Sequence, residues 1–343
     1  MRTWLPTTLV GYVIFALIPV LILISLTLGR FPIHVADAYL IVISAVLEIF
    51  QITPIHSLPS VQETIVLEIR LPRIAAALLV GSALSVAGAA YQGMFRNPLV
   101  SPDILGVSAG AGFGASLAIL ISSEPLLIQT MAFACGMIAV GMTWLISRLY
   151  RPASTLILVL AGIIVGTVFN AFVMLIKDIA DPMNKLPEIV SWLMGSLAGT
   201  DWGDLISITP AITFGVGVLL LIRWRINILA LGEEEATALG VDTRVLGALI
   251  ITASTVVTAA AVSISGVIGW VGLVIPHLSR MLVGPEYTKM LPLSAVMGAA
   301  FLLIVDNIAR TLTSTEVPLG VLTALIGAPF FAYLLTRKKV GWS

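Results

Sequence analysis

Apolar runs that are long enough to cross a bilayer and carry no charged side chain recur along the whole of this 343-residue sequence. A helix needs roughly 20 apolar residues to cross the hydrocarbon core, where every backbone polar group must be hydrogen-bonded within the protein. Charged residues make up only 10% of the chain. We therefore predict an all-α, polytopic membrane protein with about ten transmembrane helices. The expected helices, all in one domain of residues 1–343, are 9–28, 74–94, 104–121, 126–146, 156–176, 205–222, 245–266, 273–282, 291–311 and 317–335.

The stretch between Arg244 and Arg280 cannot form one continuous helix. It contains no charge, and as a single helix it would be about 50 Å long, too long for one crossing and too short for two full ones. Gly266, two further glycines and Pro276 lie in its second half, and such residues interrupt helices. We therefore expect a full helix followed by a short one.

The distribution of Lys and Arg orients the chain. Basic residues collect in cytoplasmic loops, and ten helices with the N-terminus inside would place twelve of the 18 Lys and Arg residues in the cytoplasm. Nine helices would put Arg337, Lys338 and Lys339 outside. We therefore expect both termini to be cytoplasmic in a multi-pass protein of the cell membrane, or of the inner membrane if the organism has two.

Two apolar stretches, residues 38–47 and 189–199, are too short to span and fall in outer loops, so we expect them to lie in the interface or to re-enter the membrane. Residues 83–88 (ALSVAG) resemble residues 261–266 (AVSISG) on the second and seventh expected helices. An offset of five helices would make this an inverted repeat, as in many transporters. Helix packing alone also selects small residues, so both interpretations stay open.

The sequence offers no chemistry of its own. The three histidines are scattered, no metal-ligand or nucleophile motif occurs, and the balanced charge gives no reason to expect nucleic acid. His277 is more readily explained by a hydrogen bond at a helix end than as a ligand. We therefore expect no enzyme activity, no metal and no cofactor in this chain. No phosphate-binding loop is present, so energy for uphill transport must come from another subunit.

Ionisable side chains within the expected helices are nearly absent. Asp306 and Arg310 lie four residues apart near the outer end of the ninth helix, where a structural ion pair is the favoured interpretation. Ion-coupled carriers usually need a carboxylate near the bilayer midplane. None is apparent, which disfavours an ion-coupled secondary transporter, although it remains the alternative.

The inside loop of residues 231–242 has the pattern of a short helix. Three glutamates follow Gly232, Ala236 is a helix former, and Gly240 suits a helix end. The residues alone favour a solvated connecting helix.

Several motifs, in order along the chain, resemble the permease subunits of ABC importers for iron-siderophore, haem and cobalamin, the type II importers. The resemblance runs from about residue 68 to residue 336. It is carried by residues 70–73 (RLPR), 91–99 (YQGMFRNPL), 105–112 (LGVSAGAG), 269–277 (GWVGLVIPH), 318–324 (PLGVLTA) and 327–330 (GAPF). It implies a homodimer joined by two ATP-binding-cassette ATPase subunits, which hold ATP and Mg²⁺, and by an external solute-binding protein.

The resemblance also implies roles for particular residues. The loop that contacts the ATPase would comprise Glu235, Ala236, Thr237, Ala238, Leu239, Gly240 and Val241. The binding protein would dock on Arg70, Arg73 and Arg310. An inner gate would include Asn97, Leu99, Ser154 and Thr155. The implied solute is a metal chelate, with siderophore-iron first and cobalamin, haem or an oxyanion behind. Thr167, Asn170 and Met174 either face the solute path or pack between helices.

Overall fold

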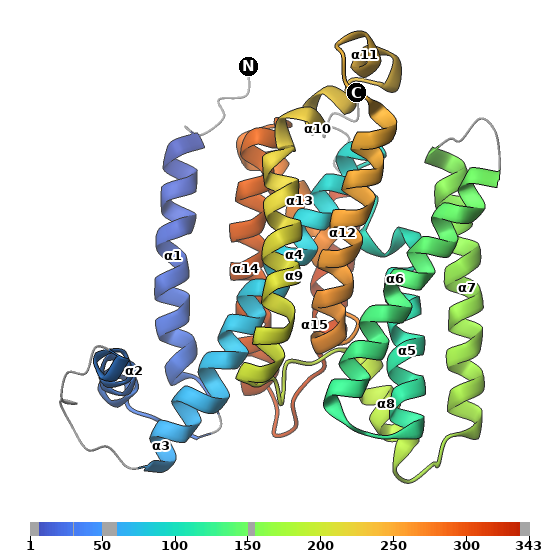
Figure 1. The fold of residues 1–343 in the computed structure, drawn as a ribbon. Coiled ribbons are helices and arrows are strands. Elements are labelled where there is room, and N and C mark those ends of the chain that lie inside the picture. Colours follow the sequence, from blue (N-terminus) through green and yellow to red (C-terminus); the bar gives the residue numbers. More distant parts are fainter. Residues whose placement is uncertain (1–6, 30, 50–59, 150–154, 337–343) are drawn as a thin grey trace.

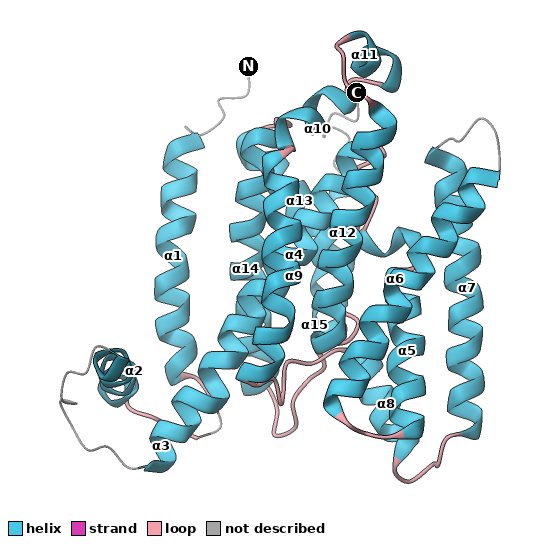
Figure 2. Cartoon of the chain, viewed as in Figure 1, coloured by secondary structure: helices cyan, strands magenta, loops and turns pink. Residues whose placement is uncertain are grey.

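The computed structural model describes residues 7–29, 31–49, 60–149 and 155–336, and this part of the chain consists of helices joined by loops, without strands (Figures 1 and 2). The prediction of an all-α polytopic membrane protein is therefore confirmed. The helices are α1 (Thr7–Thr27), α2 (Val35–Ile49), α3 (Ser60–Thr64), η1 (Ile65–Arg70), α4 (Leu71–Met94), η2 (Pro102–Leu105), α5 (Val107–Ile121), α6 (Pro125–Leu149), α7 (Thr155–Ile179), α8 (Lys185–Met194), α9 (Trp202–Leu221), α10 (Arg223–Leu229), α11 (Glu233–Ala238), α12 (Thr243–Ser265), α13 (Val271–Val283), α14 (Tyr287–Thr311) and α15 (Leu319–Thr336).

Six of these helical segments are long and apolar enough to cross a membrane, and four more are shorter and apolar. Each of the ten expected spans overlaps one α-helix of the structure, and its ends differ from the ends of that helix by at most four residues. The first of the six long segments, residues 61–94, joins α3, η1 and α4 into one continuous helix.

α4 lies at the centre of the bundle (Figure 1) and contacts α13 and α14 through glycines. A Cβ atom on Gly88 would lie 1.9 Å from the carbonyl oxygen of Gly272, and one on Gly81 would lie 2.2 Å from that of Gly298. Only glycine allows backbones to come this close. Because lipid gives no hydrophobic force between helices, such close van der Waals packing is what holds them together.

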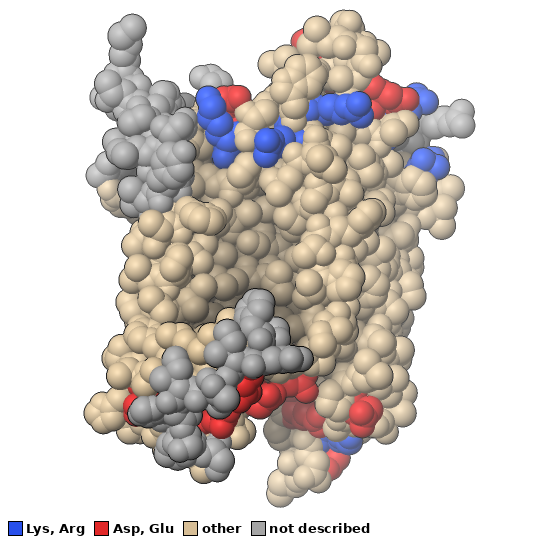
Figure 3. Space-filling view, turned by 60° about the vertical axis from the view of Figure 1, so that its left-hand side comes forward, with Lys and Arg blue, Asp and Glu red and all other residues tan. Residues whose placement is uncertain are grey.

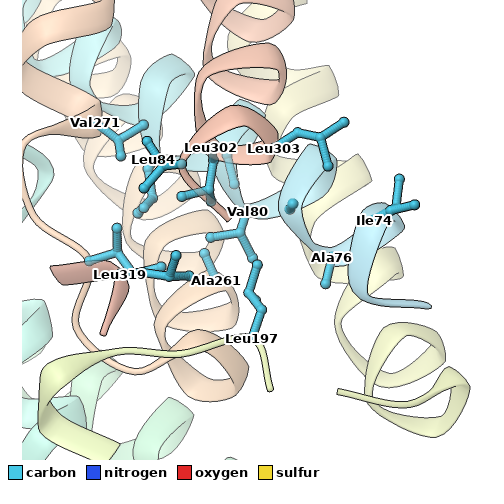
Figure 4. Close-up of a cluster of buried hydrophobic side chains, with 14 of the residues drawn as sticks. Ile74, Ala76, Val80, Leu84, Leu197, Ala261, Val271, Leu302, Leu303 and Leu319 are labelled. Carbon is cyan, nitrogen blue, oxygen red and sulfur yellow. The ribbon is translucent and has the colours of Figure 1, made fainter. Parts of the chain in front are cut away.

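The main buried cluster surrounds this contact. Figure 4 shows Val80 and Leu84 of α4 together with Leu302 of α14, Ala261 of α12 and Leu319 of α15. Four of the five are 1% exposed or less, and Leu84 is 3% exposed. The cluster therefore joins helices from both halves of the chain.

The expected break between the seventh and eighth spans is present. α12 ends at Ser265, and α13 begins at Val271. A Cβ atom on Gly266 would lie 2.1 Å from the carbonyl oxygen of Trp192, so the linker passes directly against α8. α12 and α4 run in opposite directions (Figure 1), as an inverted repeat requires, and the repeat itself stays a prediction.

The third span begins later than expected. The chain folds back into the bundle after α4, forms η2, and starts α5 well away from the end of the molecule (Figure 1). Leu105 is fully buried, and its carbonyl oxygen accepts a hydrogen bond from the Thr143 hydroxyl at 3.0 Å. Residues 100–106 are therefore packed into the bundle, each of them buried or partly buried.

Of the two short apolar stretches, residues 38–47 lie in α2, and residues 189–199 form the second half of α8 and the loop after it. α2 lies across the direction of the spans, beside the end of α1 (Figure 1). α8 packs near the end of α5, where Ile189 is fully buried.

Candidate functional site

The two ends of the molecule carry opposite charge. Figure 3 shows most of the Lys and Arg along the edge that bears α10 and α11, with some Asp and Glu among them, and mainly Asp and Glu along the opposite edge. We call these ends the basic face and the acidic face. On the acidic face, hydrogen bonds from the backbone N–H of Met183 and the side chain of Asn184 lower the pKa of Asp181 below its usual value. The positive-inside tendency makes the basic face the expected cytoplasmic one.

α11 projects from the basic face (Figure 1). It is anchored by Ala236, which is fully buried, while Glu235, Thr237, Ala238 and Gly240 are exposed and Val241 is partly buried. Leu239 is 62% exposed although it lies outside the apolar spans. The expected contact of this loop with an ATPase stays a prediction.

A partly buried polar cluster links the base of this projection to the end of α4. The amide N–H of Tyr287 donates to the Asn227 side chain of α10 at 2.7 Å. Arg280 of α13 donates to the Tyr287 hydroxyl at 3.3 Å and to the Gln92 side chain of α4 at 3.5 Å. Four helices therefore meet at these side chains.

The expected inner-gate residues occupy two separate connections. After α4, Asn97 and Leu99 are exposed, and the Asn97 side chain accepts a hydrogen bond from the Leu99 N–H at 2.9 Å. Thr155 is the first residue of α7, and Ser154 lies outside the described residues. Asn97 and Thr155 share no hydrogen bond in the part of the chain that the structure describes, and the inner gate stays a prediction.

The three arginines expected to receive the binding protein are buried. Arg70, Arg73 and Arg310 are 4%, 7% and 5% exposed. Arg73 forms ion pairs with Asp306 at 2.8 Å and with Glu316 at 2.9 Å. The ion pair of Arg310 with Asp306 is present but longer, at 3.7 Å.

The remaining donors of these arginines bind backbone oxygens. Arg70 donates to the carbonyl oxygens of Leu26 and Phe31, and Arg310 donates to that of Ser25 at 2.9 Å. The arginines therefore connect α1, α4 and α14, and their burial and internal partners leave little of them exposed in this structure. Docking of a partner on them stays a prediction and would require these contacts to exchange.

α7 presents polar side chains on an exposed face within its span. Thr167, Asn170 and Met174 are exposed and follow one another at helical spacing. The Thr167 hydroxyl donates to the Ile163 carbonyl oxygen at 2.8 Å, and no hydrogen bond is made by the Asn170 side chain among the described residues. A side-chain amide is costly against lipid, which favours a water-filled path or another protein surface here.

One polar group in the connection between α4 and α5 was not predicted from the sequence. Asp103 lies in η2, and its carboxylate accepts a hydrogen bond from the Ser108 hydroxyl in the first turn of α5. The expected third span, residues 104–121, is short for a membrane crossing. That shortness could have indicated a turn that folds back into the membrane before α5. In the described part of the chain no group of His, Cys, Asp or Glu side chains could hold a metal ion.

The fold and these surfaces define a polytopic membrane permease. Its sequence contains no phosphate-binding loop of its own, and a helix projects from its basic face. The chain belongs to the FecCD transport family, whose model matches residues 17–337. It is a permease subunit of an ABC transporter and not an enzyme.

Characterised relatives match most of the chain. The molybdate import system permease protein MolB of Haemophilus influenzae is 45% identical over 82% of this chain and 83% of its own length. The cobalamin import system permease protein BtuC of Halobacterium salinarum is 42% identical over 82% of this chain and 76% of its own length. A solved inward-facing ABC transporter, assigned to the metal-chelate type, has 39% identity and a TM-score of 0.85, covering 97% of this chain and all of its own.

Proposed function

We propose that the chain imports a metal chelate or a similar metal-containing solute by alternating access. In this proposal it acts as a homodimer with two ATPase subunits on the basic face and a solute-binding protein on the acidic face. The observation that carries the proposal is the likeness to the metal-chelate transporter over 97% of the chain.

The energy source follows from the chain's own residues. Uphill import needs a source of free energy, and the sequence has no phosphate-binding loop for ATP. α11 offers the contact for a separate ATPase, because it is exposed, short and fixed to the body at Ala236. The cluster of Asn227, Tyr287, Arg280 and Gln92 then provides a physical link from α10 to the end of α4 and the exposed Asn97. ATP and Mg²⁺ belong to the partner in this scheme.

The polar face of α7 supports a place for the solute path. A second copy of the chain against this face would shield Asn170 from lipid and leave Thr167 beside a shared channel. Most of the remaining exposed side chains of α7 are large and apolar, among them Ile163 and Phe172, which suits a path that binds its solute weakly.

We propose that the solute is a small molecule that contains a metal. The relatives named for molybdate and cobalamin differ little in their identity to this chain. Siderophore-iron, cobalamin, haem and molybdate are therefore the four solutes to be offered.

Reconstitution tests the function directly. The permease with its ATPase and binding protein would be placed in proteoliposomes, and uptake of each solute measured with ATP on the side of the basic face. We expect uptake of one solute that stops when the ATPase is inactivated. Uptake driven by a sodium or proton gradient without ATP would instead establish the alternative, an ion-coupled secondary transporter.

A further inference from the structure

An open cavity of about 160 Å³ lies between α6 and α12. Its lining is almost entirely apolar and includes Met137, Val140, Gly141 and Trp144 of α6 with Ile251 and Thr252 of α12. A Cβ atom on Gly141 would meet nothing within 4 Å, so this part of the wall faces open space. An apolar cavity of roughly 150 Å³ stays dry in water and accepts a small hydrocarbon. The cavity can therefore receive part of a hydrocarbon chain.

The cavity lies within the membrane-crossing part of the protein. Both of its walls are helices long and apolar enough to span the bilayer. Gly141 and Thr252 are exposed, so the cavity opens to the surroundings of the chain. Lipid tails are the surrounding medium at that depth.

One end of this groove carries a positive charge. The guanidinium carbon of Arg148 lies 3.6 Å from the centre of the Trp144 ring, one turn further along α6 toward the basic face. Arg148 is exposed and makes no ion pair among the described residues. Arg244, in the first turn of α12, is exposed at the same end of the molecule. Tryptophan and arginine at the end of a membrane helix are typical of the headgroup level.

We propose that this groove is a binding site for an anionic phospholipid of the leaflet next to the basic face. An acyl chain lies against Met137, Gly141 and Ile251, and the phosphate is held by Arg148, which Trp144 orients by stacking on it. Anionic lipids are favoured over zwitterionic ones because basic residues near the membrane surface attract them, and basic pockets between helices bind such headgroups. The site does not depend on the transported solute.

Native mass spectrometry of the purified full-length chain tests the proposal, with phosphatidylglycerol and phosphatidylcholine of equal chain length supplied as probes. We expect one retained phosphatidylglycerol per chain. Gly141→Leu fills the groove and should lose most of it, whereas Gly217→Leu on α9, where a Cβ atom also meets nothing within 4 Å, should retain it.

The contact between Arg148 and the lipid headgroup is tested by a second variant with its own control. Arg148→Gln should lower the preference for phosphatidylglycerol about fivefold, equivalent to ~1 kcal/mol, while Arg225→Gln, which removes another exposed arginine of the basic face, should leave it unchanged. Equal retention of the two lipids by the unaltered chain would overturn the proposal. So would a Gly141→Leu variant that keeps its lipid but changes subunit association, since a second copy would then occupy the groove.

Discussion

Arg73 of α4 donates to both carboxylate oxygens of Asp306 of α14, from Nε at 2.9 Å and 3.1 Å and from Nη2 at 2.8 Å. Asp306 is fully buried. Removing one partner of a buried ion pair leaves an uncompensated charge, which costs about 3–5 kcal/mol. We expect Asp306→Asn to lower the unfolding temperature of the purified permease clearly. The double variant with Arg73→Gln should recover part of the loss, and an unaltered unfolding temperature in Asp306→Asn would show that the pair contributes little.

Docking on Arg73 can be tested through its second partner. Glu316 competes for the same guanidinium at 2.9 Å, and its side chain is 28% exposed. If a carboxylate of the solute-binding protein binds Arg73, Glu316→Gln should raise the affinity of that protein severalfold, because a competing charge is removed. Titration of the binding protein against the reconstituted permease measures this. Unchanged affinity would leave Arg73 with its structural role alone.

The α11 contact predicts a specific uncoupling. Ala238→Arg places a long cation on the exposed side of α11 without disturbing the buried Ala236, so the permease should fold normally but lose ATP-driven uptake. Ala198→Arg, at an exposed alanine on the acidic face, is the matched control for ATPase binding. Co-purification of the ATPase and uptake would both be measured, and full coupling in Ala238→Arg would remove α11 from the interface.

The glycine contact of α4 with α13 predicts a steric effect. Gly88→Ala would drive a methyl group into the Gly272 carbonyl and should cost about 1–3 kcal/mol of stability through overpacking. Gly217→Ala, which meets open space on α9, should be neutral or slightly stabilising. Thermal unfolding of the two variants in one detergent separates these effects, and equal behaviour would contradict the backbone contact.

Topology is testable with a single thiol. Cys135 is the only cysteine and is buried in α6, so the introduced thiol of a Ser343→Cys variant can be followed without a second exposed thiol in the chain. Cytoplasmic termini predict that an impermeant maleimide labels it only after the cells are opened. Labelling of intact cells would overturn the ten-span orientation.

The spans could be predicted because their signal is local. An apolar run and its flanking charges are contained in one segment, and Gly266 marked the break between α12 and α13 within its own neighbourhood. The projecting helix of residues 233–238 was likewise visible from its glutamates and Gly232.

The arginine network could not be predicted, because its partners are far apart in the sequence. Arg73 and Asp306 are separated by 233 residues, and only the packing of α4 against α14 brings them together. The same reason hid the cluster of Gln92 and Arg280. The fold-back before α5 was missed because residues 104–106 are apolar or small and resemble the helix that follows them.

The close approach of Gly88 to Gly272 and of Gly81 to Gly298 also matters for measuring motion in this molecule. α4 meets the backbone of α13 at Gly88 and that of α14 at Gly81, so we expect spin labels on α4 and α14 to report one unchanging interlabel distance throughout the ATP cycle. The distance between the labels on α4 and α14 would serve as an internal reference. Labels on α7 and α4 could then be compared with it, and any broadening of their distance distribution could be assigned to α7.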